Sequence, residues 1–487
     1  MRLSVQRQKT AIKRIEFSRP IQLALEHGLL TQSTSVFDYG CGRGDDIRRL
    51  NQQGVDVDGW DPLHRPESKR RSADVVNLGY VVNVIEDVAE RIDVLKDAWS
   101  LTQKVLIVSA RLSLEANRSG LCSPYSDGCV TSRGTFQKFY DQHELGGWID
   151  DVLDVKSLAI APGIFYVFRD SELRQSFDAS RYRRKTAIPR QRFSDLIFER
   201  YSELFDVLTG FLTVRGRLPD ESEIAVADLI REKIGSLPRA FAIIRKVTGA
   251  EQWAVIREER TQDLLVYLAL SRFAGRPRFS QLPRDLQLDV RAFFPNYRKA
   301  CELADQLLFS AGKRELISES CRTSSVGKRL PDALYLHASA LPALPSVLRV
   351  YEGCARAYIG SVENANVIKL KVSKPQISYL YYPDFEKTAH PALAGSLVVP
   401  LNNFRIKYNE YSESVNPFIL HRKETLLAQG HPLRARFERL TEQEERCGLY
   451  EHPESIGTKD GWERVLNSKG FTLSGHRLIK TSRTVTV

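Results

Sequence analysis

Apolar and polar positions follow two patterns through the first 170 residues, one typical of strands and one typical of helices. Short apolar runs, typical of strands buried in a sheet, occur at 36–39, 55–60, 73–78 and 105–108. Apolar side chains at helical spacing occur in segments 20–30, 85–102 and 134–148. Two further strands are expected near 152–160 and 163–169. This alternation of strands and helices predicts an α/β unit over residues 1–170.

The rest of the chain divides into three parts. Residues 171–192 contain the most basic stretch and are expected to be a linker. Residues 193–312 keep a helical period, and 263–270 is apolar nearly all round, which is typical of a helix buried in a bundle. Residues 313–487 mix helical and strand patterns. We therefore predict that an all-helical domain and a mixed α+β C-terminal domain follow the α/β unit.

The net charge of the chain indicates a candidate binding partner. The 487 residues carry a net charge of +11, which favours a polyanion such as DNA. The stretch 181–192 holds six basic residues and no acid. Such a run is either a solvated linker or a strap that contacts phosphate. The candidate phosphate contacts are Arg181, Arg183, Arg184 and Lys185.

The sequence also indicates the cellular compartment in which the protein is expected. No signal-peptide pattern follows Met1, and no apolar run is long enough to span a bilayer. The seven cysteines are scattered, without a C-x-x-C pair or zinc-ligand spacing. We therefore expect a cytoplasmic protein with no membrane association, reduced thiols and no metal site.

The segment after the first predicted strand carries the strongest chemical signal. Asp38 is followed by glycines at alternate positions, Gly40, Gly42 and Gly44, and then by an amphipathic helix. Glycines let the backbone turn sharply and approach a ligand, and the start of a helix offers free amides. The second strand ends at Asp61, at the place where an acid binds the ribose hydroxyls of a nucleoside cofactor.

Two cofactor classes compete for this pattern. A nicotinamide-binding domain expects G-x-G-x-x-G, whereas the glycines here alternate and an acid precedes them. The turn and the second acid together resemble the class I S-adenosylmethionine-dependent methyltransferases, whose sheet is Rossmann-like. The resemblance implies that the turn takes the methionine end of S-adenosylmethionine and that the second-strand acid takes its ribose. The residues that it assigns to the cofactor are Asp38, Tyr39, Gly40, Cys41, Gly42, Gly44, Asp61, Pro62 and Leu78.

The same resemblance points to the end of the third strand for the methyl acceptor. Asn77-Leu78-Gly79-Tyr80 stands where exocyclic-amine DNA methyltransferases carry Asp/Asn/Ser-Pro-Pro-Tyr/Phe/Trp, but it lacks both prolines. It implies that Asn77 accepts a hydrogen bond from a base amine and that Tyr80 stacks on the base. We expect both side chains to face the methyl position. Only about a dozen residues separate Asp61 from Asp74, so one strand usual in this fold is expected to be missing.

Longer segments resemble the DNA phosphorothioation-associated methyltransferase family. They are residues 10–14, 37–46, 59–62, 79–87, 131–140, 265–273 and 378–385. This resemblance implies a bacterial system that places sulfur in the DNA backbone, with DNA and other proteins of that system as partners. Two alternatives stay open. One is a non-catalytic module that binds DNA or a sulfur-modification enzyme, and the other is methylation of RNA or a small molecule.

Overall fold

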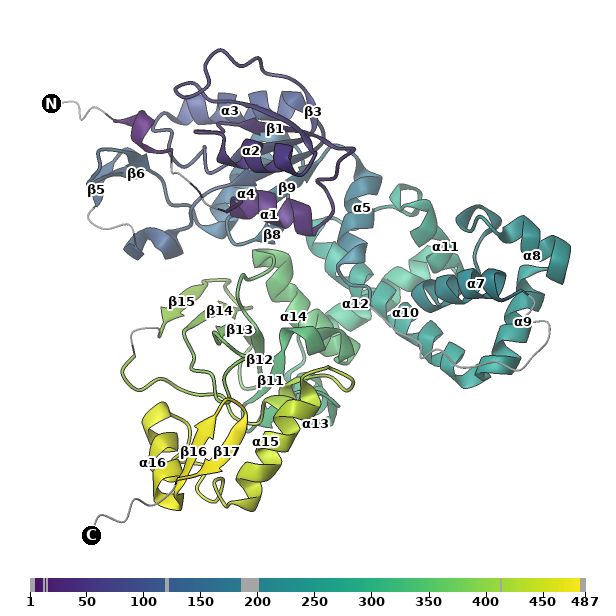
Figure 1. The fold of residues 1–487 in the computed structure, drawn as a ribbon. Coiled ribbons are helices and arrows are strands. Elements are labelled where there is room, and N and C mark those ends of the chain that lie inside the picture. The colour runs from purple at the N-terminus through teal and green to yellow at the C-terminus, as the bar shows by residue number, and fades with distance from the viewer. Residues whose placement is uncertain are drawn as a thin grey trace, which may run out of the picture.

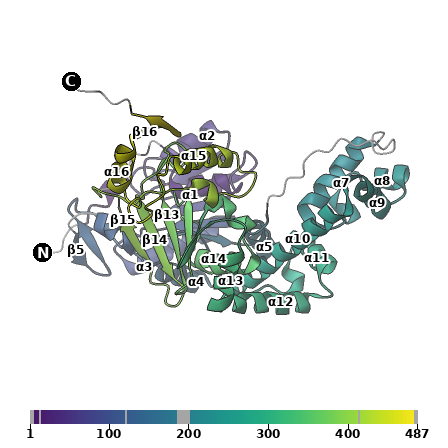
Figure 2. The ribbon, with the colours of Figure 1, turned by 90° about the horizontal axis from the view of Figure 1, so that it is seen from below.

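The computed structural model describes residues 5–11, 14, 16–118, 122–184, 201–411 and 414–481. Figure 1 shows an α/β unit, a helical arm and a second body that contains another sheet. In the view of Figure 2 the arm extends to one side, away from both sheets. Within the described ranges, no helix has both the length and the apolar character needed to cross a membrane.

The α/β unit is built on a six-stranded sheet. Its strands are β1 (Ser35–Tyr39), β2 (Asp56–Trp60), β3 (Ala73–Gly79), β4 (Thr102–Ser109), β8 (Leu158–Ala161) and β9 (Ile164–Phe168). Their order is β2-β1-β3-β4-β9-β8. The first four pair in parallel, whereas β9 runs antiparallel to both β4 and β8. The sheet is therefore mostly parallel, as expected for an α/β unit.

The expected loss of one strand is also confirmed. β2 forms the edge of the sheet, and residues 62–72, all of which the structure describes, contain only turns, bends and one isolated bridge. The segment between Asp61 and Ala73 is too short for a crossover helix and a further parallel strand, which together need a dozen or more residues.

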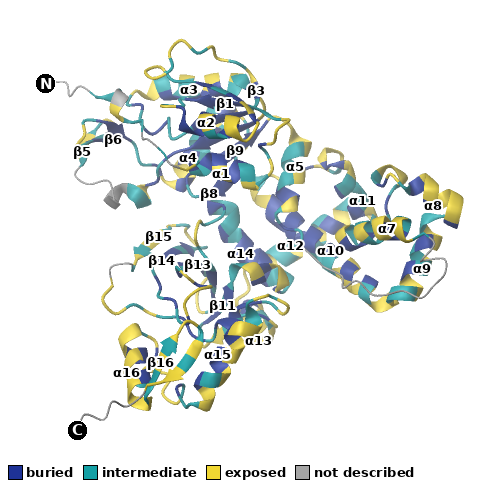
Figure 3. Cartoon of the chain, in the orientation of Figure 1, coloured by how far each residue is buried: buried dark blue, intermediate teal, exposed yellow. Residues whose placement is uncertain are grey.

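Helices cover both faces of this sheet. They are α1 (Arg19–Glu26), α2 (Asp45–Gln52), α3 (Val88–Leu101) and α4 (Gln142–Leu153). Residues of α1 and α2 share one hydrophobic core, and those of α3 and α4 share the other. Because neighbouring strand residues point to opposite faces, Val36 joins the first core and Phe37 the second. Figure 3 shows the strands buried between these layers.

A small sheet follows β4 and corrects two expectations. Its strands are β5 (Cys122–Tyr125), β6 (Gly128–Thr131) and β7 (Phe136–Gln137). The prediction that all seven cysteines are reduced is wrong, because Cys122 and Cys129 form a disulfide. Pairing of β5 with β6 brings their Cα atoms to 5.7 Å, a distance that a disulfide spans. The helix expected from residue 134 begins only at Gln142, because β7 pairs with β6 and Asp141 forms a capping box.

The middle of the chain is helical. The α-helices of its described residues are α5 (Ser171–Ser180), α7 (Ser202–Arg215), α8 (Ala227–Ile234), α9 (Leu237–Thr248), α10 (Ala250–Leu270), α11 (Arg284–Phe293), α12 (Tyr297–Ser310) and α13 (Arg314–Thr323). α5 occupies the first half of the segment expected to be a linker. Residues of α7, α8, α9 and the first half of α10 form a separate core. The second half of α10 is buried from Leu264 to Leu270, as its apolar pattern predicts.

The C-terminal body contains a second six-stranded sheet, antiparallel and in chain order. Its strands are β10 (Lys328–Leu330), β11 (Ala333–His337), β12 (Val367–Lys371), β13 (Gln376–Tyr381), β14 (Gly395–Pro400) and β15 (Lys407–Glu410). The other elements are α14 (Ser346–Ile359), α15 (Arg434–Arg446), α16 (Lys459–Lys469) and the hairpin β16 (Phe471–Ser474) and β17 (Arg477–Lys480). One core contains Leu268 of α10, Ala304 of α12 and Val399 of β14. Apolar packing is therefore continuous across the expected boundary at 312/313.

The C-terminal body touches the α/β unit at the edge strand β8. Ser361 N donates to Ile160 O at 2.6 Å, and Arg19 pairs with Glu363 at 3.4 Å. A Cβ on Gly360 would lie 2.2 Å from the Ile160 carbonyl carbon, so this contact requires glycine. Arg19 also lines the cavity described next, and the two bodies therefore meet beside it.

Candidate cofactor and acceptor site

A cavity of about 870 Å³ opens at the carboxyl ends of the parallel strands. It lies where β1 and β3 are neighbours and the chain order runs outward in both directions. Open α/β sheets bind ligands at this switch point. The cavity walls are the turns after β1, β2, β3 and β4, together with residues between Val5 and Arg19. Its volume falls in the range of small-molecule sites.

The turn after β1 needs glycine for packing as well as for conformation. Gly40 has a φ of +78°, and a Cβ on it would lie 2.5 Å from Val81 Cγ2. Gly42 has a φ of +53°. Gly40 N and Cys41 N both donate to Trp60 O, at 2.7 and 3.1 Å, which ties this turn to the end of β2. The turn therefore presents bare backbone to the cavity.

Asp61 is held in place by three backbone amides. Its Oδ2 accepts from Gly42 N at 3.0 Å. Its Oδ1 accepts from Leu63 N at 3.0 Å and from His64 N at 2.8 Å. A carboxylate oxygen can accept two hydrogen bonds, so Oδ2 keeps capacity for a ligand hydroxyl. The carboxylate is thus preorganised on the cavity wall.

Asp38 lies at the base of the glycine turn. It is 6% exposed, and its Oδ1 accepts from Asn77 Nδ2 at 2.8 Å. Burial and the nearby charge of Asp46 raise the pKa of Asp38 to about 7. The carboxyl group is therefore balanced between its two protonation states near neutral pH, and a cation placed beside it would favour the charged one.

The structure does not place Asn77 facing the cavity, where it was expected. Asn77 is 2% exposed and lies in mid-sheet, beside Asp38 of β1 and Ile107 of β4. It does not face the cavity among the walls that the structure describes. Leu78 is fully buried in the core on the α3 side and does not line the cavity either. Both sit one or two residues before β3 ends at Gly79, where the cavity begins.

The other predicted cofactor residues are placed as follows. Those that line the cavity are Tyr39, Gly40, Cys41, Gly42, Asp61 and Pro62. Gly44 lies just behind the turn and is the N-cap residue of α2, with a φ of 73°. The Tyr39 ring meets Trp60 edge-on at 5.4 Å, and Arg70 stacks over Trp60 at 4.0 Å. These aromatic groups build the cavity wall on the Asp61 side.

Tyr80 does line the cavity, in an unusual backbone conformation. Its φ is 60°, which non-glycine residues rarely adopt. Tyr80 N donates to Ser109 O at 3.0 Å and to Ser109 Oγ at 3.1 Å, which holds this conformation. Burial raises the pKa of Tyr80 to about 12, so its hydroxyl stays protonated at neutral pH. The Arg14 guanidinium lies 5.8 Å from the ring centroid.

Several lining residues were not singled out from the sequence. They are Thr10, Asn83, Arg111, Glu115 and Gln137. They come from four segments that are far apart in the chain. Thr10, Asn83 and Gln137 fall within the segments 10–14, 79–87 and 131–140, but that resemblance assigned them no role. For Arg111, a polar residue shortly after a predicted strand end is the available signal.

The N-terminal segment forms one wall of the cavity. Arg14 N donates to Asp45 Oδ2 at 2.8 Å, which ties this segment to the start of α2. Arg7 makes a bidentate contact of 2.7 Å with Glu90 and a 3.0 Å contact with Glu86. These contacts hold the segment against the loop between β3 and α3.

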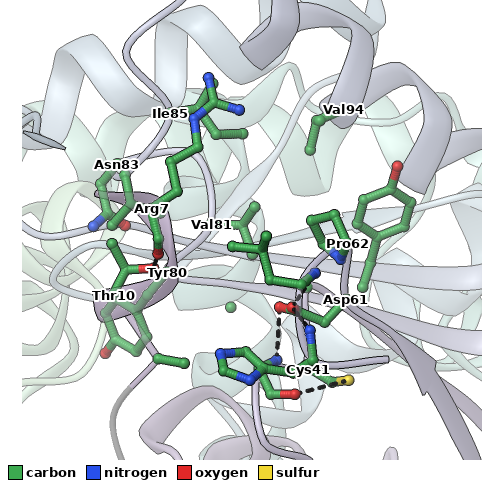
Figure 4. A pocket seen from close by; sticks show the side chains of 18 of the residues that line it. Arg7, Thr10, Cys41, Asp61, Pro62, Tyr80, Val81, Asn83, Ile85 and Val94 are labelled. Atoms are coloured by element: carbon green, nitrogen blue, oxygen red, sulfur yellow. Dashed lines mark hydrogen bonds between the residues drawn. The ribbon is translucent and has the colours of Figure 1, made fainter. Parts of the chain in front are cut away.

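Figure 4 shows that the labelled lining side chains fall into two groups on either side of Val81. Asp61 and Pro62 lie on one side of Val81, and Tyr80 and Asn83 lie on the other. The cavity therefore has two ends: an acidic end at the tip of β2, and an end after β3 that combines an aromatic ring with a carboxamide.

The predicted phosphate strap folds inward where the structure describes it. Its described side chains are Arg181, Arg183 and Arg184; Lys185 lies outside the described residues. Arg181 pairs with Asp178 at 3.4 Å, and Arg184 pairs with Asp263 at 3.0 Å. Arg183 is half-buried, and this partial burial lowers its pKa. Arg181 and Arg184 are thus engaged in internal ion pairs, which argues against phosphate contacts by these two residues.

Comparisons with known proteins give only remote likenesses. No family model and no curated protein matches the chain. A methyltransferase from Aquifex aeolicus, described as S-adenosylmethionine-dependent, is 14% identical over 33% of this chain and 95% of its own, with a TM-score of 0.23. The 1,6-didemethyltoxoflavin N1-methyltransferase of Burkholderia thailandensis, solved with S-adenosylhomocysteine, is 12% identical over 31% and 75%, with a TM-score of 0.24. A sugar N-methyltransferase from Streptoalloteichus sp. ATCC 53650 is 12% identical over 31% and 84%, with a TM-score of 0.24. At these scores, the function is argued from the residues of the chain itself.

Proposed function

We propose that this protein is an S-adenosylmethionine-dependent methyltransferase. One observation carries the proposal: the Gly40–Gly42 turn and the Asp61 carboxylate face a single cavity at the switch point of the sheet. The alternating glycines and the antiparallel strand β9 both depart from the pattern of dinucleotide-binding domains. This favours the methyltransferase over a nicotinamide enzyme.

The residues present fit this cofactor. A Cβ on Gly40 would collide with Val81 Cγ2 at 2.5 Å, so this turn reaches the cavity as bare backbone, which suits a close approach by the methionine end. The spare acceptor capacity of Asp61 Oδ2 suits a ribose hydroxyl. Asp38 lies at the base of the turn but does not line the cavity, so it is not placed to touch the methionine end directly. Apolar surface for the adenine ring comes from Pro62, Leu63 and Val94.

Bound S-adenosylmethionine would supply a methyl group on an already activated sulfonium. The protein must then align the acceptor with this methyl group and keep water away. Arg7, Thr10 and Arg14 of the N-terminal wall line the cavity and would help to exclude water from it. Tyr80 lies across Val81 from Asp61, at the end where an acceptor would bind.

We also propose DNA as the acceptor, in a cytoplasmic bacterial pathway linked to DNA phosphorothioation and its proteins. The resemblance over residues 79–87 and 131–140 supports this context, as does the net charge of +11. Arg111 lines the cavity and forms no ion pair with any described residue. Its guanidinium is suited to a phosphate beside the reacting nucleotide.

A non-catalytic module is the second candidate, because Asn77 is buried and the amine contact that it was expected to make is lost. Methyl transfer separates the two. The full-length protein would be incubated with tritiated S-adenosylmethionine and, in parallel, phosphorothioated DNA, plain DNA, RNA and a metabolite extract. Counts in DNA support the proposal, and counts only in RNA or metabolites contradict the DNA assignment. Cofactor binding without transfer to any acceptor establishes the module.

A further inference from the structure

Asn83 leaves a buried hydrogen-bond acceptor without a partner. The residue is 1% exposed and lines the cavity after β3. Its Oδ1 accepts no hydrogen bond from any described residue. A buried carbonyl oxygen without a donor is unfavourable, and folded proteins rarely retain one. A ligand that brings an N–H group to this position would satisfy it.

The position of Asn83 is fixed by its neighbours rather than by its own carboxamide. Its backbone O accepts from Lys138 N at 2.8 Å and from Gln137 Nε2 at 3.2 Å. The Lys138 ammonium pairs in turn with Asp127 at 3.1 Å and Glu144 at 2.7 Å. The loop after β3 is therefore held against β7, and the orphaned Oδ1 is preorganised.

Two further groups complete this wall. Gln137 is 7% exposed, lines the cavity and donates through Nε2 to two backbone carbonyls. Its Oε1 accepts no hydrogen bond within the described part of the chain. The Tyr80 ring lies at the same end of the cavity, on the far side of Val81 from Asp61. The wall thus combines one aromatic face with two carboxamide oxygens.

We propose that Tyr80, Asn83 and Gln137 form the acceptor subsite and that it takes a DNA base carrying an exocyclic amine. An aromatic face suits a planar base by stacking. Carboxamide oxygens suit amine hydrogens, and Asn83 thereby takes the role that the sequence assigned to Asn77. This inference rests on the proposed methyltransferase function.

The corresponding reaction balances without a further reactant. The amine nitrogen forms a bond to the methyl carbon as the sulfur–carbon bond breaks, and that electron pair stays on sulfur. The nitrogen then releases one proton to water. Asn83 Oδ1 accepts a hydrogen bond from the amine, and this bond strengthens as positive charge develops on the nitrogen. Asn83 orients the amine and removes no proton.

The test uses stability and transfer together. Asn83→Leu replaces an unsatisfied polar group by an apolar one of similar size, so its melting temperature should equal or exceed that of the wild type. Asn366 is the matched control, because its carboxamide donates to Tyr382 O and accepts from Tyr382 N. Asn366→Leu should therefore lower the melting temperature.

Transfer is measured with single-stranded oligo-dA, oligo-dC, oligo-dG and oligo-dT, of which only oligo-dT lacks an exocyclic amine. We expect transfer to at least one of the first three and none to oligo-dT. Asn83→Leu should reduce kcat/KM about 100-fold or more while its affinity for S-adenosylhomocysteine is unchanged. Tyr80→Leu should raise KM at least tenfold, and Tyr80→Phe should retain the wild-type KM.

Each other outcome overturns the inference in a distinguishable way. If the wild type does not bind S-adenosylhomocysteine, the proposed function fails and the subsite fails with it. If it binds but transfers no methyl group to amine-bearing oligonucleotides, or transfers it to oligo-dT, the acceptor class is wrong while the assignment of the cofactor site stands. If Asn83→Leu lowers the melting temperature as Asn366→Leu does, or leaves kcat/KM unchanged, Asn83 is structural.

Discussion

Asn77 donates a hydrogen bond from Nδ2 to Oδ1 of Asp38 at 2.8 Å, inside the sheet and below the cavity. The bond joins the residue expected to do chemistry to the residue expected to hold the cofactor. It removes Asn77 from the acceptor end. It also stabilises the charged form of an Asp38 carboxyl whose pKa is raised overall.

Asp38→Asn should become more stable relative to the wild type as the pH rises. Burial raises the pKa of Asp38 from 3.8 to about 7. Between these values the folded state keeps a proton that the unfolded state releases, so wild-type stability falls with rising pH and levels off above about 7. Asp38→Asn does not lose stability in this way. Its free energy of unfolding, relative to that of the wild type, should therefore rise by at most about 4 kcal/mol across this range.

Urea unfolding of both proteins between pH 5 and 8.5 measures this difference. Asparagine keeps an Oδ1 that can accept from Asn77, so the variant is expected to fold. A difference in stability that does not vary with pH would show that Asp38 ionises in the folded protein as it does in water.

Gly40→Ala should be far more damaging than Gly28→Ala. Both glycines have positive φ, +78° and +69°, so each substitution carries a backbone cost of about 1–2 kcal/mol. The new Cβ at 40 would lie 2.5 Å from Val81 Cγ2, whereas at 28 nothing lies within 4 Å. Overpacking should add about 1–3 kcal/mol at 40 only. Thermal unfolding of the two variants checks this, and equal losses would contradict the packed turn.

The glycine turn could be predicted from sequence because its chemistry is local. Gly40, Gly42 and Asp61 follow directly on two apolar strands, and the chain has to turn at the strand ends. The absence of one strand could be predicted from the short length of the segment between Asp61 and Asp74 alone. In the same way, the apolar pattern of 263–270 was enough to predict a buried helix, because it needs no knowledge of a partner.

The acceptor end could not be predicted, because it depends on where β3 stops. Asn77 lies two residues before the end of the strand and Asn83 four residues after it. The turn between them includes Tyr80 at a φ of 60°, which no periodicity reveals. The phosphate contacts predicted for Arg181 and Arg184 could not be judged from sequence for a related reason. Their partners, Asp178 and Asp263, are brought beside them only by the tertiary fold.

Maleimide labelling under denaturing conditions should modify five cysteines without reductant and seven after reduction. The five are Cys41, Cys301, Cys321, Cys354 and Cys447, and the disulfide protects Cys122 and Cys129. Intact-mass spectrometry of freshly purified protein counts the adducts. Seven adducts before reduction would contradict the disulfide.

Arg7→Met should loosen the N-terminal wall of the cavity. Arg7 joins this wall to Glu86 and Glu90, and its loss should speed release of S-adenosylhomocysteine several-fold with little change in melting temperature. Arg71→Met is the control, because Arg71 makes a similar bidentate contact with Asp56 away from the cavity. Stopped-flow release should separate the two variants, and equal rates would show that the Arg7 contacts do not retain the ligand.

The most direct test of the central claim is calorimetric titration of S-adenosylmethionine into the wild type and Asp61→Ala. We expect the wild type to bind and the variant to lose about 1.5–3 kcal/mol of binding free energy, roughly ten- to a hundredfold in affinity, because a ribose hydroxyl loses its charged acceptor. Circular dichroism should show that the variant keeps its fold. Absence of binding by the wild type, or unchanged affinity in a folded Asp61→Ala, would contradict the assignment of this cavity to S-adenosylmethionine.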